Sequence, residues 1–202
     1  MSDLDRLWLR TFQKVVDKAA HEIKDSLNGV SLNLEVVRSR AQKEGSATAL
    51  ARFAEAASSQ LETLTERTEA LLFLARPARS GTGSDVALAL RHLATLLASA
   101  ARADGGTLDV SGWDRPAPTT AATEAVRLAL ASGLLELMEM GGTGTCSLEA
   151  GSDAVVRFSH ESARTCSLDS AIAASLADEK VVIQRGDRSG KSGDLLMVFP
   201  GS

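Results

Sequence analysis

A histidine and a glutamate stand side by side at His21 and Glu22, in a stretch whose periodicity predicts a long helix. Each helical residue turns the side-chain direction by about 100°, so His21 lies about 200° from Ala19 and Ile23, two members of the apolar stripe. We therefore expect His21 to point into water. An exposed imidazole titrates near physiological pH and keeps a ring nitrogen free for nucleophilic attack or proton transfer. Glu22 is expected to accept a hydrogen bond from the other ring nitrogen and so raise nucleophilicity.

A stripe of mostly polar residues shares the outward direction of His21. A solvent-facing histidine on an amphipathic helix often has no function, and this interpretation stays open. Zinc binding is disfavoured, because the HExxH motif pairs histidines four residues apart and Asp25 occupies the second place. The members of the stripe lie within about 60° of His21, and they are Lys14, Asp17, Lys24, Asp25, Asn28, Leu32 and Glu35.

The elements that must position this stripe are two long helices within residues 1–78. Gly45 and Ser46 interrupt the apolar pattern, which resumes at Leu50 and ends before Pro77. We expect an antiparallel helical hairpin that dimerises into a four-helix bundle, because a lone hairpin leaves apolar surface exposed to water. In the first helix the apolar residues recur at steps of three and four, at Leu9, Phe12, Val16, Ala19, Ile23, Val30 and Val37, with Leu27 and Leu34 widening the stripe.

A second domain is expected over residues 85–202, after a linker at residues 79–84 that is rich in glycine and serine. The order of helices and hairpin-connected strands predicts an α/β sandwich whose sheet carries helices on one face, so the fold class of the whole chain is α+β. Helical patterns cover residues 85–102, 120–140 and 170–177, and strand patterns cover residues 107–112, 145–150, 154–159, 180–184 and 195–199.

The segment HEIKDSLNGV, from His21 to Val30, resembles the H-box of sensor histidine kinases, His-Glu-Ile/Leu-Arg/Lys-Asn/Thr-Pro-Leu. In that family the histidine is the phosphoacceptor and lies on the first helix of a dimeric hairpin, which an ATP-binding α/β domain of the Bergerat type follows. Two positions depart from the pattern. Ser26 replaces the usual proline, and Asp25 replaces the residue that orients water in the phosphatase reaction of many members.

The second domain departs further from the kinase pattern. The family needs an asparagine-rich helix for magnesium, an Asp-x-Gly-x-Gly loop for adenine and a glycine-rich lid, because amide groups and close backbone approach hold the metal and the phosphates. Ser132 and Glu136 stand at the matching helical places, and His160 to Arg164 replace the adenine loop. No glycine occurs between Gly151 and Gly186. We therefore expect a degenerate Bergerat-type domain.

This combination resembles bacterial histidine phosphotransferases built on a kinase-like dimer. The resemblance implies that His21 takes a phosphoryl group from the aspartate of one response regulator receiver domain and passes it to another, with Glu22 orienting the imidazole and Lys24 steadying phosphate oxygens. It also implies that this chain binds no cofactor and that the receiver supplies Mg²⁺. The expected receiver contacts are Asp25, Asn28, Leu32 and Glu35.

Two alternatives stay open beside this interpretation. One is a non-catalytic pseudokinase scaffold that binds or sequesters a response regulator, and the other is an active sensor histidine kinase. The scaffold has the same surface but no phosphate turnover, whereas the kinase requires binding of ATP and magnesium.

The composition argues against several other classes. The chain has 202 residues, 44% of them hydrophobic, and a net charge of −4, which disfavours nucleic-acid binding because phosphate neutralisation needs a basic face. No stretch approaches the roughly 18 uncharged apolar residues of a membrane span, and acids occupy the N-terminus, so we expect a cytoplasmic protein without membrane contact. Cys146 and Cys166 are too few for a disulfide framework and are expected to be small buried residues.

Overall fold

The computed structural model describes residues 2–41, 47–77, 84–161, 166–188 and 192–201, and its α+β architecture confirms the fold class. Most of the expected linker, and also Gly45 and Ser46, lie outside the described residues. The helices are α1 (Asp3–Ala41), α2 (Ala47–Ala75), α3 (Val86–Ala103), α4 (Thr123–Met140) and α5 (Ser170–Asp178). The strands are β1 (Ser84–Asp85), β2 (Thr107–Ser111), β3 (Pro118–Thr119), β4 (Thr143–Ala150), β5 (Ala154–His160), β6 (Val182–Arg188) and β7 (Ser192–Phe199).

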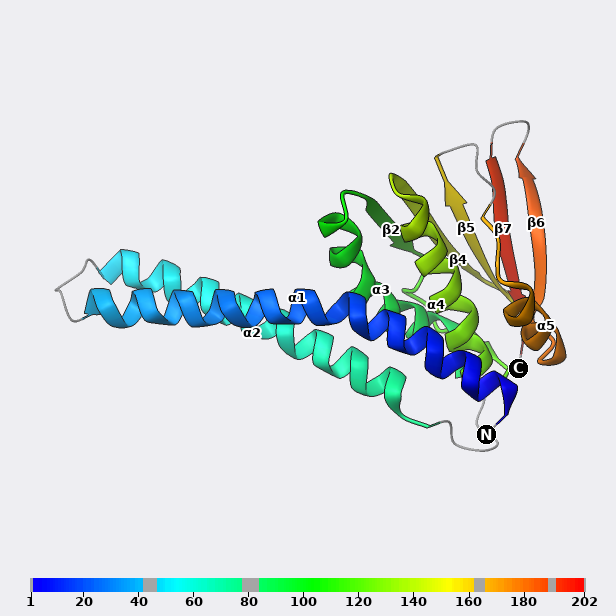
Figure 1. Cartoon of the computed structure of the whole chain (residues 1–202), viewed down its shortest axis with the longest axis horizontal. Coiled ribbons are helices and arrows are strands. Elements are labelled where there is room, and N and C mark those ends of the chain that lie inside the picture. The colour runs from blue at the N-terminus through cyan, green and yellow to red at the C-terminus, as the bar shows by residue number, and fades with distance from the viewer. Residues whose placement is uncertain (1, 42–46, 78–83, 162–165, 189–191, 202) are drawn as a thin grey trace.

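The two long helices lie side by side as the expected antiparallel hairpin, and they extend well beyond the rest of the molecule (Figure 1). α1 continues through Ser26 as one helix, since serine supplies the backbone N–H that proline lacks. Gly29 brings the helices close together, because a Cβ atom there would lie 2.4 Å from Nε2 of Gln60 on α2. The apolar stripe of α1 is only partly covered: Ala19 and Val30 are buried, whereas Leu9, Leu27 and Leu34 stay exposed.

The remaining chain forms a five-stranded mixed sheet in the order β2-β4-β5-β7-β6. β2 and β4 are parallel and α4 connects them, while every other neighbouring pair is antiparallel. β1 and β3 form a two-stranded ribbon that the sequence does not predict, and it pairs Ser84, the last residue of the expected linker, with Thr119. Asp85 caps α3 by accepting hydrogen bonds from the N–H groups of Ala87 and Leu88.

Helices cover one face of the sheet, as the sequence predicts, and α4 lies at the centre of the molecule. α4 lies between the sheet, on one side, and the N-terminal half of α1, on the other (Figure 1). Every residue from 125 to 135 is therefore buried. Apolar residues on most sides of a helix are typical of such an enclosed position, and Arg127 and Ser132 are the polar members of this buried stretch. Trp8, Val15 and Ala19 of α1 therefore belong to the same core as α4.

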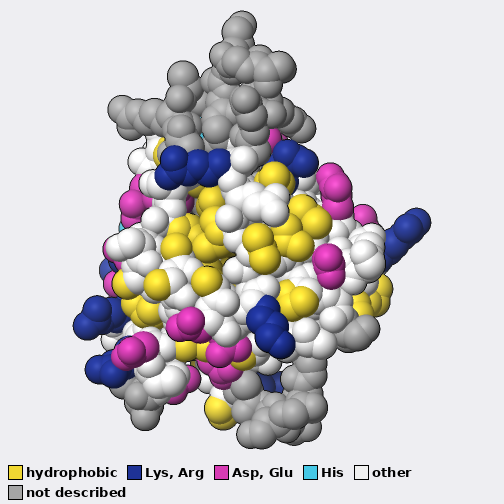
Figure 2. Space-filling view, turned by 90° about the vertical axis from the view of Figure 1, so that its right-hand side faces the viewer, with side chains coloured by type: hydrophobic (Ala, Val, Ile, Leu, Met, Phe, Trp, Pro, Cys, Tyr) yellow, Lys and Arg dark blue, Asp and Glu magenta, His cyan; other side chains and the backbone are white. Residues whose placement is uncertain are grey.

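The opposite face of the sheet is open to solvent, and hydrophobic side chains gather on the side of the molecule shown in Figure 2. Val155 and Val182 both pair with Val198, so these three valines form a row across β5, β7 and β6. Val182 is 49% exposed, and the other two are half-buried. The alternation along β5, in which every second residue is buried, is the period expected for a strand with one covered face.

Two further features bear on the sequence predictions. Cys146 and Cys166 are free and buried, as expected, and burial raises the pKa of both thiols, that of Cys166 to about 12. Among the described helices, α3 is long and apolar enough to cross a membrane by length and composition alone. However, 56% of that stretch is buried inside the protein, as in the core helix of a globular domain.

Candidate functional site

The outward stripe of α1 is present as predicted. The His21 side chain is 72% exposed, because the buried residues of α1 around it lie on the opposite side of the helix. Leu32 is 64% exposed and is the apolar member of the stripe. The structure thus brings the predicted site residues together on one accessible face, where each is exposed: Lys24, Asp25, Asn28, Leu32 and Glu35.

The carboxylate next to His21 is not the one that the sequence suggested. Oδ2 of Asp25 lies 3.4 Å from Nε2 of His21, one helical turn along the exposed face. Glu22 instead turns inward, its side chain is only 16% exposed, and Oε2 lies 3.5 Å from Nη2 of Arg67. The expected hydrogen bond from His21 to Glu22 is therefore corrected to a contact with Asp25. The reason is the 100° step between consecutive helical residues, which separates the directions of His21 and Glu22.

Arg67 of α2 is a buried cation behind His21 that the sequence analysis missed. Its side chain is 10% exposed, and Nη1 donates to the Glu22 carbonyl oxygen at 2.9 Å and to Oγ of Ser26 at 2.8 Å. Nη2 donates to Oγ of Ser99 on α3 at 2.8 Å. A signal was present in the sequence, because Arg67 lies three residues after Leu64 and four before Leu71, a spacing that puts it on the same side of the helix as both leucines.

A second buried arginine joins α4 to the end of α2. Arg127 is 4% exposed, and its guanidinium donates to the carbonyl oxygens of Phe73 at 3.0 Å and Arg76 at 2.6 Å. These carbonyls lie at the C-terminus of α2, where the helix leaves acceptors without internal partners. Burial lowers the pKa of Arg127, which nonetheless stays protonated as arginines do in proteins. These two hydrogen bonds thus link α4 to the end of the hairpin.

Ser132 and Glu136, the two α4 residues that the resemblance singled out, line a hollow of about 190 Å³ between α4, α1 and the segment before α5. Thr11 and Lys14 line it from α1. Glu136 accepts a hydrogen bond from the backbone N–H of Ser167 at 3.2 Å. Within the described part of the chain, the buried hydroxyl of Ser132 has no hydrogen-bond partner. The N-terminal half of α1 thus forms one wall of this hollow.

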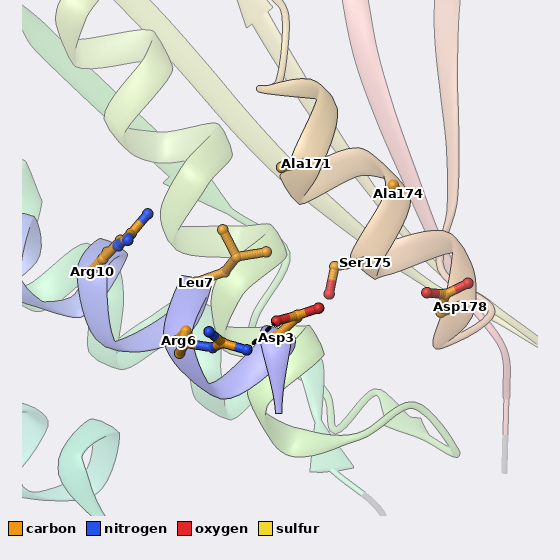
Figure 3. Close-up of a pocket in the computed structure, with 8 residues that line it drawn as sticks. All are labelled: Asp3, Arg6, Leu7, Arg10, Ala171, Ala174, Ser175 and Asp178. Carbon is orange, nitrogen blue, oxygen red and sulfur yellow. Dashed lines mark hydrogen bonds and ion pairs between the residues drawn. The ribbon is translucent and has the colours of Figure 1, made fainter. Parts of the chain in front are cut away.

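A wider hollow of about 420 Å³ lies between the start of α1 and α5, and none of the predicted site residues lines it. Figure 3 shows Arg6 paired with Asp3, while Arg10 points away from both. Small side chains, Ala171 and Ala174 among them, form the wall that α5 contributes. This hollow is separate from the His21 face.

The other two histidines occupy structural positions. His92 on α3 stacks on Phe73 with ring centroids 4.2 Å apart, and burial, followed by the nearby charge of Arg91, lowers its pKa. The ring of His160 is buried and contacts the carbonyl oxygen of Gly141. Neither histidine lies on the exposed face that carries His21.

Comparison with known proteins adds distant similarities in fold. No family model matches the sequence, and no curated protein matches it. Among solved structures, that of the histidine kinase AdeS of Acinetobacter baumannii is 14% identical, with a TM-score of 0.40, and the match covers 83% of this chain and 94% of the solved AdeS chain. Full-length ShkA, solved in complex with AMPPNP, is 17% identical with a TM-score of 0.42, over 93% of this chain and 45% of ShkA.

Proposed function

We propose that this chain is a cytoplasmic histidine phosphotransferase of a two-component phosphorelay. In this role, His21 carries a phosphoryl group between the aspartates of two receiver domains. The observation that carries the proposal is the position of the His21 imidazole, which is 72% exposed on the first helix of a hairpin, within a segment that resembles an H-box. An exposed imidazole presents its nitrogen lone pair to a docked protein without any movement of the helix.

The chemistry requires little from this chain beyond a presented nucleophile. A ring nitrogen of His21 attacks the phosphorus of a receiver's aspartyl phosphate, so that the N–P bond forms, the acyl O–P bond breaks and the aspartate leaves as a carboxylate. The return step is the reverse reaction on a second receiver. The receiver supplies Mg²⁺ and most of the charge stabilisation, and exposed Lys24 lies one turn from His21 to contact phosphate oxygens.

Receiver docking is proposed along the stripe below His21. Leu32, at 64% exposure, provides an apolar anchor, and Asn28 and Glu35 provide polar contacts on either side of it. Asp25 lies between this surface and His21, so it contacts both the imidazole and the docked receiver.

The proposal includes a homodimer that forms a four-helix bundle. Leu27 and Leu34 are 48% and 51% exposed, seven residues apart on α1, and Leu61 on α2 is 46% exposed. Large apolar side chains exposed at heptad spacing indicate a helix–helix contact with another chain. We expect Leu34→Glu to convert a dimer into a monomer in light scattering, and a monomeric wild-type protein would contradict this part of the proposal.

An ATP-dependent kinase is supported less well by the geometry. Ser132 and Glu136 replace asparagine, and α1 lines the hollow in front of them. The fixed contacts of Arg127 with the end of α2 also oppose the large domain movement that would carry ATP from α4 to His21. We therefore propose that the α/β domain has lost the kinase reaction.

The test is the source of acid-labile phosphate on His21. The protein is incubated with receivers phosphorylated on aspartate and, separately, with ATP and magnesium, and the modified residue is mapped. We expect label from the receiver alone, loss of label in His21→Gln and retention of label in the control His92→Phe. Label from ATP and magnesium would identify a kinase instead.

One observation favours the scaffold as a second candidate. The Asp25 carboxylate, 3.4 Å from Nε2, would repel a phosphoryl group placed on that nitrogen. A scaffold would bind receivers with micromolar or tighter affinity and accept no phosphate. Asp25→Asn separates the two roles, since it is expected to speed acceptance by a phosphotransferase and to leave a scaffold without label.

A further inference from the structure

The strongest unassigned feature near His21 is the cluster formed by Arg67 with Glu22, Ser26 and Ser99. Arg67 is 8% exposed as a residue and comes from α2, whereas Glu22 and Ser26 belong to α1 and Ser99 belongs to α3. The proposed chemistry at His21 uses neither Arg67 nor Ser99. A buried guanidinium with several donors in use indicates a fixed junction of three helices.

The cluster holds the inner side of the helical turn that carries His21. Ser26 donates from Oγ to the Glu22 carbonyl oxygen at 2.9 Å, and Arg67 donates to both of these oxygens at 2.9 and 2.8 Å. Three hydrogen bonds therefore hold the turn from residue 22 to residue 26. Because His21 directly precedes this turn and points to its outer side, the direction of its Cα–Cβ bond is set by the same contacts.

The cluster also explains the serine that replaces proline in the H-box. A proline at position 26 would remove the backbone donor to the Glu22 carbonyl and also the hydroxyl that accepts from Arg67. Serine supplies both groups, and its hydroxyl donates to one partner while it accepts from the other. The serine that departs from the H-box pattern is thus the residue that accepts a hydrogen bond from Arg67.

Ser99 extends the cluster into the α/β domain. Its Oγ accepts from Nη2 of Arg67 at 2.8 Å, so Arg67 links α3 to the turn that follows His21. The same Nη2 lies 3.5 Å from Oε2 of Glu22, whose carboxylate balances the buried charge. Any shift of α3 relative to the hairpin therefore acts on the hydrogen bonds that hold this turn.

We infer that Arg67 is a positioning residue for His21, and that through Ser99 it makes the α/β domain a brace for the phosphoacceptor turn. The inference deepens the proposed function and rests on it for the chemical readout. It gives the degenerate domain a role that requires no nucleotide.

The experiment compares Arg67→Met, Arg67→Lys and Ser99→Ala with the control Arg52→Met, which removes an exposed arginine from the same helix. The rate of transfer from a phosphorylated receiver is measured as a function of receiver concentration, in the full-length protein. For Arg67→Met we expect about a tenfold lower rate at saturation with an unchanged half-saturating concentration, because misplacement of a nucleophile slows the chemical step and leaves docking intact. Arg67→Lys is expected to recover part of the rate.

Ser99→Ala tests the brace with little risk to folding, since it removes one hydroxyl. A two- to threefold fall in the saturating rate is expected, with an unchanged half-saturating concentration. Wild-type rates at saturation in both Arg67→Met and Ser99→Ala would overturn the inference while leaving the proposed function in place.

A second readout does not depend on phosphate transfer. The side-chain order of His21 is measured by NMR relaxation in the wild-type protein and in both variants. We expect increased motion of the ring in Arg67→Met and in Ser99→Ala, and unchanged motion in Arg52→Met. A failure of the wild-type protein to accept phosphate from any receiver contradicts the proposed function alone, whereas unchanged ring order in both variants contradicts the brace.

Discussion

Replacement of Arg127 by methionine is the perturbation whose effect on stability follows most directly from the structure. The guanidinium is 4% exposed and donates two hydrogen bonds, to the carbonyl oxygens of Phe73 and Arg76 at the end of α2. It also lies 5.4 Å from the centroid of the Phe73 ring. Methionine keeps most of the volume and the apolar stem but removes the charge and every donor.

The magnitude is a balance of two contributions. Hydrogen bonds that involve a charged group contribute about 1.5–3 kcal/mol each, so the two bonds amount to about 3–6 kcal/mol. The desolvation of the buried cation opposes this gain, which is the reason that the pKa of Arg127 is lowered, and methionine removes that cost. We expect Arg127→Met to reduce the free energy of unfolding by about 3 kcal/mol, or to lower Tm by about 6–12 °C in a chain of this length.

The assay is urea denaturation followed by circular dichroism, with thermal unfolding in parallel. The free energy of unfolding of Arg127→Lys should lie between those of the wild type and Arg127→Met. A single ammonium group cannot reach both carbonyl oxygens as the planar guanidinium does. The control Arg115→Met removes an exposed arginine and should change the free energy of unfolding by less than about 0.5 kcal/mol. A change in the free energy of unfolding for Arg127→Met as small as that for Arg115→Met would refute the reasoning.

Three further predictions concern packing, pH dependence and thiol reactivity. Gly133→Ala should destabilise the protein by about 1–2 kcal/mol in urea despite alanine's higher helix propensity, because its Cβ would lie 2.6 Å from the ring of Phe158; a stabilised variant would contradict this. Burial depresses the pKa of His92 in the folded state, so the unfolded state binds the proton more readily and stability should fall as the pH drops below about 6.5, less steeply in His92→Phe. Cys146 and Cys166, whose thiol pKa values burial raises, should react with a thiol reagent at pH 8 only as fast as the protein unfolds; rapid labelling of the native protein would be inconsistent with their burial.

Local pattern was sufficient for most of the secondary structure and for the direction of His21. Helical and strand periods lie within single segments, and the expected helices and strands of the α/β region match α3 to α5, β2 and β4 to β7 within a few residues. The two-residue strands β1 and β3 were missed because so short a pairing has no period of its own. The exposure of His21 followed from its angle to Ala19 and Ile23 on a single helix.

The partners of charged side chains were decided by tertiary structure. The sequence placed Glu22 next to His21, but packing of α2 against α1 brings Arg67 to Glu22 and leaves Asp25 with the imidazole. A half-buried carboxylate is paired with a cation that lies 45 residues away in the chain, and no local spacing encodes that pairing.

The sequence by itself therefore determined the elements, their apolar faces and the exposed histidine, because these depend on residues within a few turns of one another. Only the tertiary structure decided that α1 covers α4, that β2 and β4 are parallel, and that Arg67 and Ser99 connect the α/β domain to the His21 turn. Such contacts join segments far apart in the chain, and they form only where the packing of whole helices brings matching groups within hydrogen-bond distance.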